Sequence, residues 1–90
     1  MATFIVRFAV YGALPGGNQS AAQAANVQQR LQSLIDGQKG IVAINNTSFG
    51  DPAPNNVKHF AASVNRDGAD YSFACQEGQQ IDFNTGGGVQ

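Results

Sequence analysis

Charged residues are scarce in this sequence, and neither sign dominates. They make up 12% of the 90 residues, about half the usual share, and five Lys and Arg against six Asp and Glu give a formal net charge of −1 at pH 7. Proteins that bind DNA or RNA by neutralising phosphates need clustered cations. We therefore expect no nucleic-acid partner, because the five cations are scattered: Arg7, Arg30, Lys39, Lys58 and Arg66.

Cysteine and histidine occur once each, as Cys75 and His59. A single cysteine forms no disulfide within the chain and supplies no thiolate cage for zinc. Around a single histidine, only carboxylates would be left to complete a metal site. The sequence therefore predicts no metal site and no cofactor.

Long apolar runs are missing as well, since none reaches the roughly 18 residues that a membrane span needs. Residues 1–11 are mostly apolar, but their only cation, Arg7, lies inside the apolar stretch, whereas a signal peptide carries its cations in front of it. We expect no membrane partner and, by default, a cytoplasmic location, with export without a signal peptide left open.

Apolar residues and neutral amides are what the chain does contain. Leu, Ile, Val and Phe make up 21 of the 90 residues, and Asn and Gln another 18. This apolar content lies just above the ~20% below which chains tend to be disordered, so we expect a folded chain with a thin core. The sequence predicts one domain over residues 1–83 and a flexible, Gly-rich tail over residues 84–90.

Residues 3–11 alternate with a period of two, which is typical of a strand. The even positions, Phe4, Val6, Phe8 and Val10, are all apolar and should face the core. The odd positions are mixed, so this side of the strand is either half covered or used for contact.

A helix is predicted over residues 21–36. Ser20 and Gln23 match a capping box at its start, and Gly37 suits its end. Residues 41–44 are apolar on both sides, as in an interior strand, so we expect a right-handed crossover that makes the strands before and after the helix parallel. The apolar stripe of the helix consists of Ala24, Val27, Leu31, Leu34 and Ile35.

The dipeptide Asp67-Gly68 lies between two strand-like segments, residues 58–66 and 69–76. Asp and Gly tolerate the positive φ of a type I′ turn, and a two-residue turn fixes the register of the hairpin. The predicted pairs are Val64 with Tyr71, Ala62 with Phe73, Phe60 with Cys75, Ser63 with Ser72, and Ala61 with Ala74.

Together these segments predict an α+β fold. We expect a mixed sheet of four or five strands, with one amphipathic helix packed on one face. Along the chain the elements follow the order β-α-β-β-(β), with residues 80–83 as the last strand. A 16-residue helix is about 24 Å long and covers only two or three strands. The opposite face should remain open, with these side chains on it: Arg7, Ala9, Tyr11, Ala61, Ser63, Ser72 and Ala74.

Cys75 and His59 are the one pair that suggests nucleophilic catalysis, because a thiolate needs a nearby base or cation. In the predicted register, however, Cys75 lies opposite Phe60, so the side chain of the adjacent His59 projects from the other face. We interpret Cys75 as a packing residue and His59 as a surface residue.

Two further features have plain structural interpretations. The turn Gly12–Gly17 precedes the predicted helix, where backbone amides suit an anion, but it lacks the spacing of a dinucleotide fingerprint and the Lys of a phosphate loop. Four acidic residues near the hairpin ends are expected to serve turn geometry and solubility. Arg66 and Asp70 are expected to form an exposed ion pair. The acidic residues are Asp67, Asp70, Glu77 and Asp82.

The long Asn-, Gly- and Pro-rich loop over residues 45–56 is the best place to expect recognition, because long loops in small domains are often functional. An ordinary loop with Phe49 tucked beneath it fits equally well. The candidate binding residues are Asn45, Asn46, Ser48, Phe49 and Asp51 from this loop, and Tyr11 from the open sheet face.

Residues 73–83, which read FACQEGQQIDF after the Asp67-Gly68 hairpin, resemble the ending of small uncharacterised proteins from Gram-negative bacteria. The resemblance covers about the last third of the chain and contains no catalytic motif. It implies a bacterial source and an unassigned role.

The leading functional hypothesis is a non-enzymatic domain that acts by protein–protein contact, as a homodimer or with another protein. One helix does not shield the whole sheet, and a small chain buries a limited fraction of its surface. The alternatives are a small enzyme using Cys75 and His59 or the loop over residues 45–56, and a small-ligand or carbohydrate binder using the amide-rich surface.

Overall fold

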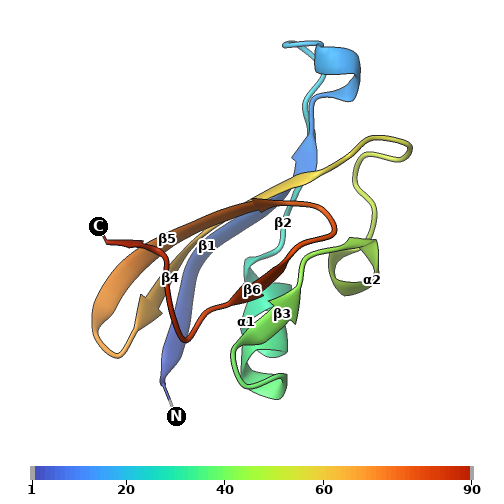
Figure 1. The fold of residues 1–90 in the computed structure, drawn as a ribbon. Coiled ribbons are helices and arrows are strands. Elements are labelled where there is room, and N and C mark those ends of the chain that lie inside the picture. Colours follow the sequence, from blue (N-terminus) through green and yellow to red (C-terminus); the bar gives the residue numbers. More distant parts are fainter. Residues whose placement is uncertain (1, 90) are drawn as a thin grey trace.

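Strands dominate the computed structural model, which describes residues 2–89 (Figure 1). Five of them form one antiparallel sheet in the order β2-β1-β4-β5-β7, and β3 and β6 form a second, two-stranded antiparallel sheet. The predicted α+β class is confirmed. The elements are β1 (Phe4–Ala13), the 3-10 turn η1 (Pro15–Gly17), β2 (Gln23–Asn26), α1 (Gln28–Gly37), β3 (Ile41–Ala43), α2 (Asn46–Phe49), β4 (His59–Arg66), β5 (Ala69–Gln76), β6 (Gln80–Asp82) and β7 (Gly88–Val89).

The core lies on one side of the five-stranded sheet. Helix α1 packs there beside the β3–β6 pair, as Figure 1 shows, and buries the side chains of Leu31, Leu34 and Ile35. We call this side of the sheet the core face and the opposite side the outer face. The sheet contributes these buried side chains to the core: Phe4, Val6, Ala9, Tyr11, Phe60, Ala62, Val64 and Phe73.

A β-bulge in β1 changes which of its residues face the core. Val6 pairs with Val64 but Phe8 pairs with Ser63, so Arg7 is an extra residue without a partner on β4. One inserted residue exchanges the two sides of a strand. Beyond it the odd positions Ala9 and Tyr11 are buried, whereas Phe8 is 50% exposed.

The prediction that Phe8 and Val10 face the core, and that Ala9 and Tyr11 lie on the open face, was therefore wrong. The alternation runs on through the bulge in the sequence, because apolar residues occupy both sides of this strand. Ile5, Ala9 and Tyr11 are the apolar residues at odd positions. The hydrophobic pattern consequently contains no mark of the inserted residue.

The helix begins seven residues later than predicted. Residues 23–26 form β2, which pairs with β1 from Val10 to Ala13, and the expected capping box at Ser20 and Gln23 is not formed because the helix starts only at Gln28. Alanine-rich segments favour helix, but pairing with a neighbouring strand overrides this weak preference. Gly12 permits the pairing, since a Cβ on Gly12 would lie 2.3 Å from the carbonyl oxygen of Gln23.

The expected parallel crossover is also wrong, and the main sheet is antiparallel rather than mixed. Strand β3 pairs with β6, where Val42 lies opposite Ile81, and it does not join the main sheet. The physical reason is that both edges of β1 are already occupied, one by β2 and the other by β4. The predicted last strand is present as β6.

The β4–β5 hairpin confirms the predicted register at all five pairs, from Phe60 opposite Cys75 to Val64 opposite Tyr71. Asp67 and Gly68 have φ values of 52° and 96°, as a type I′ turn requires. The turn is also bonded to the N-terminal segment, because the Thr3 amide donates to Asp67 Oδ1 at 2.8 Å.

The Gly-rich segment after Phe83 makes contacts that the sequence did not lead us to expect. Gly88–Val89 pair with Tyr71 and Ser72 of β5 as β7, and the Arg66 guanidinium donates to the carbonyls of Phe83 and Gly86. Residue 1 of the predicted domain (residues 1–83) and residue 90 of the predicted tail (residues 84–90) lie outside the described part of the chain. The flexibility of the tail stays a prediction.

Substituting two adjacent glycines separates a docked tail from a free one. Gly86 and Gly87 both have positive φ, but a Cβ on Gly87 would lie 2.8 Å from the Phe73 ring, whereas one on Gly86 would meet nothing within 4 Å. We expect Gly86→Ala to lower the free energy of unfolding by about 1 kcal/mol, because L side chains disfavour this backbone conformation. Gly87→Ala should lower it more. Urea denaturation measures both, and equal, negligible effects would contradict the docked tail.

Candidate functional site

Three of the predicted binding residues meet on the core face. The Tyr11 hydroxyl donates to Asn46 Oδ1 at 2.7 Å, and the Phe49 ring packs against the Tyr11 ring, with 5.3 Å between centroids. Phe49 also stacks on Phe60, at 5.6 Å. Tyr11 is fully buried, and this burial raises the pKa of its hydroxyl. These contacts attach the segment around α2 to the sheet.

The side chains of Asn45 and Ser48 form hydrogen bonds to backbone groups in or next to the same segment. Asn45 Oδ1 caps α2 by accepting from the Ser48 amide at 2.9 Å, and the Ser48 hydroxyl donates to the Ala43 carbonyl at 2.7 Å. Asn45 thus satisfies an amide in the first turn of a very short helix, and Ser48 satisfies the carbonyl of the last residue of β3. Their observed contacts are those of residues that shape a loop.

Asp51 binds Lys58, a residue that the sequence analysis did not single out. Lys58 Nζ lies 2.8 Å from Asp51 and 3.4 Å from Glu77, and it donates to the Asn56 carbonyl at 2.7 Å. The hydrogen bond to Asp51 raises the pKa of Lys58, burial opposes this increase, and Glu77 adds to it. The side chain is only 2% exposed, so a buried ammonium ion binds the second half of the loop, from Asp51 to Asn56, to Glu77. An isolated Lys after a Pro- and Asn-rich loop gives no sequence signal for this role.

Cys75 and His59 lie on opposite faces, as the hairpin register predicts. Cys75 is opposite Phe60 and packs against the core, whereas His59 is opposite Gln76 and exposed. Burial raises the pKa of the Cys75 thiol. A mostly protonated thiol whose only histidine in the chain lies on the other face of the sheet is a poor nucleophile.

The remaining sequence-based candidates are placed differently from expectation. The Gly12–Gly17 turn does not lead into a helix, because β2 follows it, so the amides proposed for an anion are not at a helix N-terminus. Asp70 lies near Arg7, at 3.5 Å, rather than near Arg66, while Arg66 lies over the Tyr71 ring at 3.9 Å. Within residues 2–89, no three acidic, His or Cys side chains converge as metal ligands, and no helix has the length and apolarity of a membrane span.

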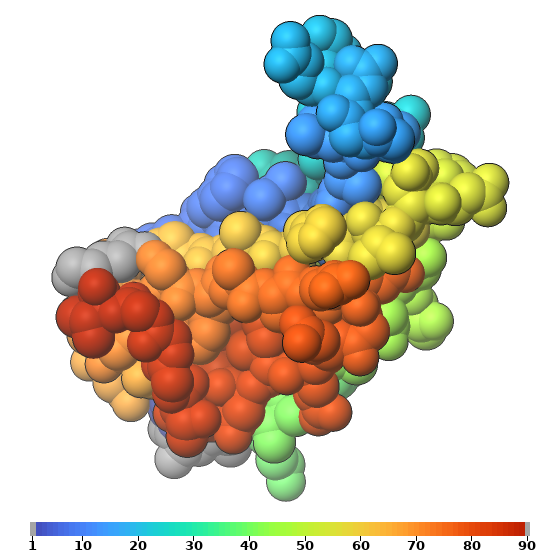
Figure 2. Space-filling view, turned by 45° about the horizontal axis from the view of Figure 1, so that its top comes forward, coloured from blue at the N-terminus to red at the C-terminus, as the bar shows by residue number. Residues whose placement is uncertain are grey.

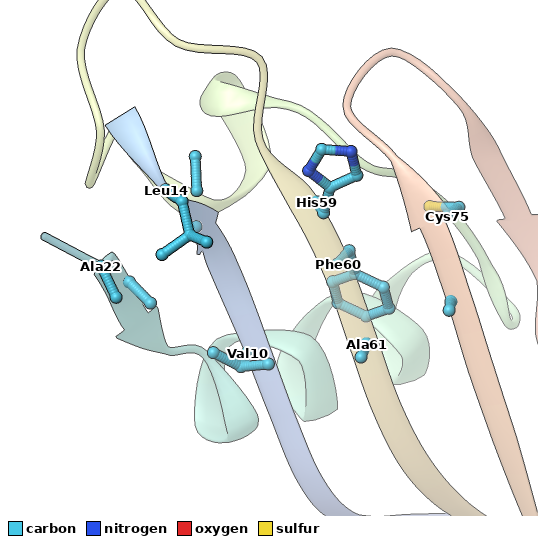
Figure 3. A pocket seen from close by; sticks show the side chains of 11 residues that line it. Val10, Leu14, Ala22, His59, Phe60, Ala61 and Cys75 are labelled. Atoms are coloured by element: carbon cyan, nitrogen blue, oxygen red, sulfur yellow. The ribbon is translucent and has the colours of Figure 1, made fainter. Parts of the chain in front are cut away.

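The outer face of the sheet contains an apolar groove that sequence reasoning missed. Beyond the bulge, the outward positions of β1 carry Phe8, Val10 and Gly12, and Leu14 follows directly after the strand. Phe8 and Leu14 are 50% and 48% exposed. Figure 3 shows side chains from β1, β4 and the segment that starts β2 around the hollow. The groove, about 670 Å³, is lined by Val10, Gly12, Ala13, Leu14, Ala22, Ala24, His59, Phe60, Ala61, Ala74 and Cys75. Phe60 and Cys75 occupy strand positions whose side chains face the core.

A projecting hairpin forms one wall of this groove. The end of β1, η1 and the segment leading into β2 stand clear of the body, as Figures 1 and 2 show. We call residues 13–22 the arm. Its Leu14 and Ala22 are exposed and line the groove. Large apolar side chains therefore border a hollow whose floor carries small ones, such as Gly12 and Ala61.

Removing one hydroxyl tests the attachment of the loop. Tyr11→Phe leaves Asn46 Oδ1 without its buried donor, so we expect the free energy of unfolding to fall by about 1 kcal/mol. The control Tyr71→Phe keeps its ring beneath Arg66 and should change stability by less than about 0.5 kcal/mol. Urea denaturation gives both values, and similar values for the two variants would contradict the proposed role of Tyr11.

Alkylation measures the environment of the single thiol. Because burial raises the pKa of Cys75, less thiolate is present at any given pH in the folded chain than in the unfolded one. We expect the rate of iodoacetamide reaction to rise with pH along a curve whose midpoint is higher for the folded chain than for the chain in urea. A folded midpoint at or below the unfolded one would contradict a half-buried thiol of low reactivity.

Comparison with protein-family models, with curated proteins and with solved structures gives no match to this chain. The resemblance of residues 73–83 to proteins of Gram-negative bacteria therefore stays a prediction. The basis for a functional conclusion is the surface of the chain itself.

Proposed function

We propose that this chain acts by protein–protein contact and associates with itself through the outer face of its five-stranded sheet. The observation that carries the proposal is a set of large apolar side chains left exposed along one strand. Ile5, Phe8 and Leu14 are 47%, 50% and 48% exposed; Ile5 and Phe8 belong to the outward side of β1, and Leu14 directly follows this strand. Contiguous exposed apolar surface typically marks a contact site.

The composition of the outer face also supports self-contact. Small side chains from β2, β4 and β5 lie beside the apolar row of β1, so the surface is smooth enough to approach another sheet closely. Its charged groups Arg7 and Asp70 have opposite signs and lie 3.5 Å apart. Two copies can therefore face each other without strong repulsion, because like-charge juxtaposition is the main electrostatic obstacle to association. The polar loop residues, by contrast, already have partners within the chain.

Sedimentation equilibrium at micromolar to millimolar concentrations tests this proposal. We expect a reversible monomer–dimer equilibrium, which Phe8→Asp should weaken at least tenfold by placing a charge in the contact. Val57→Asp is the matched control, because Val57 is 56% exposed, precedes β4 and borders the hollow beside Asp51 and Lys58 rather than the outer-face groove. A wild-type chain that remains monomeric, or a dimer equally sensitive to both substitutions, would overturn the proposal.

A further inference from the structure

From the outer-face groove we infer that its occupant is the arm of a second copy, with Leu14 of each chain inserted into the hollow of the other. This inference rests on the proposed self-association and adds its geometry. It assigns a function to residues 13–22, whose projection from the body the packing of the core does not require (Figure 2).

The first argument is the match between the projecting side chain and the hollow. Leu14 is an exposed branched side chain at the rim of the groove. The floor beside it is made from side chains that consist of one methyl group, so a branched side chain from outside meets no bulky group there. These floor residues are Ala24, Ala61 and Ala74.

The second argument is symmetry. Leu14 and the hollow belong to the same groove of the same chain. A two-fold rotation that places one Leu14 over the partner's hollow therefore also places the partner's Leu14 over the first hollow. Such an interface is self-complementary and closes at two copies. The two sheets would then pack face to face, about 10 Å apart, as in a sandwich.

The third argument is area. Strands about 4.8 Å apart and about 3.3 Å per residue give the part of the outer face formed by β2, β1, β4 and β5 roughly 500 Å². A specific dimer buries about 600 to 1,000 Å² on each partner. The flat sheet alone falls short of this range, so the proposed contact includes the arm as well as the sheet.

A small apolar ligand is a poorer occupant. Sites for such ligands enclose most of the molecule they bind, whereas this groove is open to solvent along its length. An extended surface of a second protein covers an open groove more completely.

Disulfide trapping tests the geometry directly. In a Cys75→Ser background, chains carrying Leu14→Cys are mixed with chains carrying Ala61→Cys and a size-distinguishing tag, and are then mildly oxidised. A disulfide needs Cα atoms about 4.4 to 6.8 Å apart, so we expect the mixed dimer to exceed either homodimer by at least fivefold. Val57→Cys mixed with Ala61→Cys is the control and should give no enrichment.

Filling the hollow gives an independent measurement. Ala61 is exposed in the monomer, so Ala61→Trp leaves the core intact and should preserve the far-ultraviolet circular dichroism while weakening dimerisation at least tenfold. A dimer that is sensitive to Phe8→Asp but shows no mixed disulfide and no effect of Ala61→Trp would overturn the arm geometry and leave the proposed self-association standing. A strictly monomeric wild type would overturn both.

Discussion

The extra residue at Arg7 is the constraint on which the rest of the structure depends. Before it, Phe4 and Val6 face the core; after it, Ala9 and Tyr11 do. The exchange brings the Tyr11 hydroxyl to Asn46 and so anchors the segment around α2. The same exchange turns the Phe8–Leu14 row to the outer face. One unpaired residue thus produces both the attachment of the long loop and the apolar surface that the proposed contact uses.

Local signals in the sequence were sufficient where a short segment decides its own geometry. The Asp67-Gly68 turn fixed a register that the structure confirms at each predicted pair, and the Leu31–Ile35 stripe correctly identified the buried side of α1. Tertiary pairing decided the rest. An alanine-rich segment became β2 because Gly12 allows β1 to approach it closely, and β3 was left to pair with β6 because β1 had two neighbours already. Propensity and periodicity describe one segment at a time and contain no information about which edges are occupied.

The candidate site shows the same division. Asn45, Ser48 and Asp51 were chosen because their side chains are polar and lie in a long loop, and in the structure these polar groups bind the loop itself through the Ala43 carbonyl, the end of α2 and Lys58. The sequence did not predict the outer-face groove, because alanine and glycine have no functional groups that indicate a binding site. Its significance comes from the arrangement of small residues on β2, β4 and β5 beside exposed large ones on β1, which only the strand order reveals.

Interstrand nuclear Overhauser effects between β1 and β4 test the bulge most directly, because the bulge shifts every pair after it by one residue. We expect cross-strand contacts of Phe8 with Ser63 and of Val10 with Ala61, together with contacts between the Tyr11 and Phe49 rings. Contacts of Phe8 with Ala62 and of Val10 with Phe60 would mean an unbroken ladder. That result would return Phe8 and Val10 to the core and remove the apolar outer face.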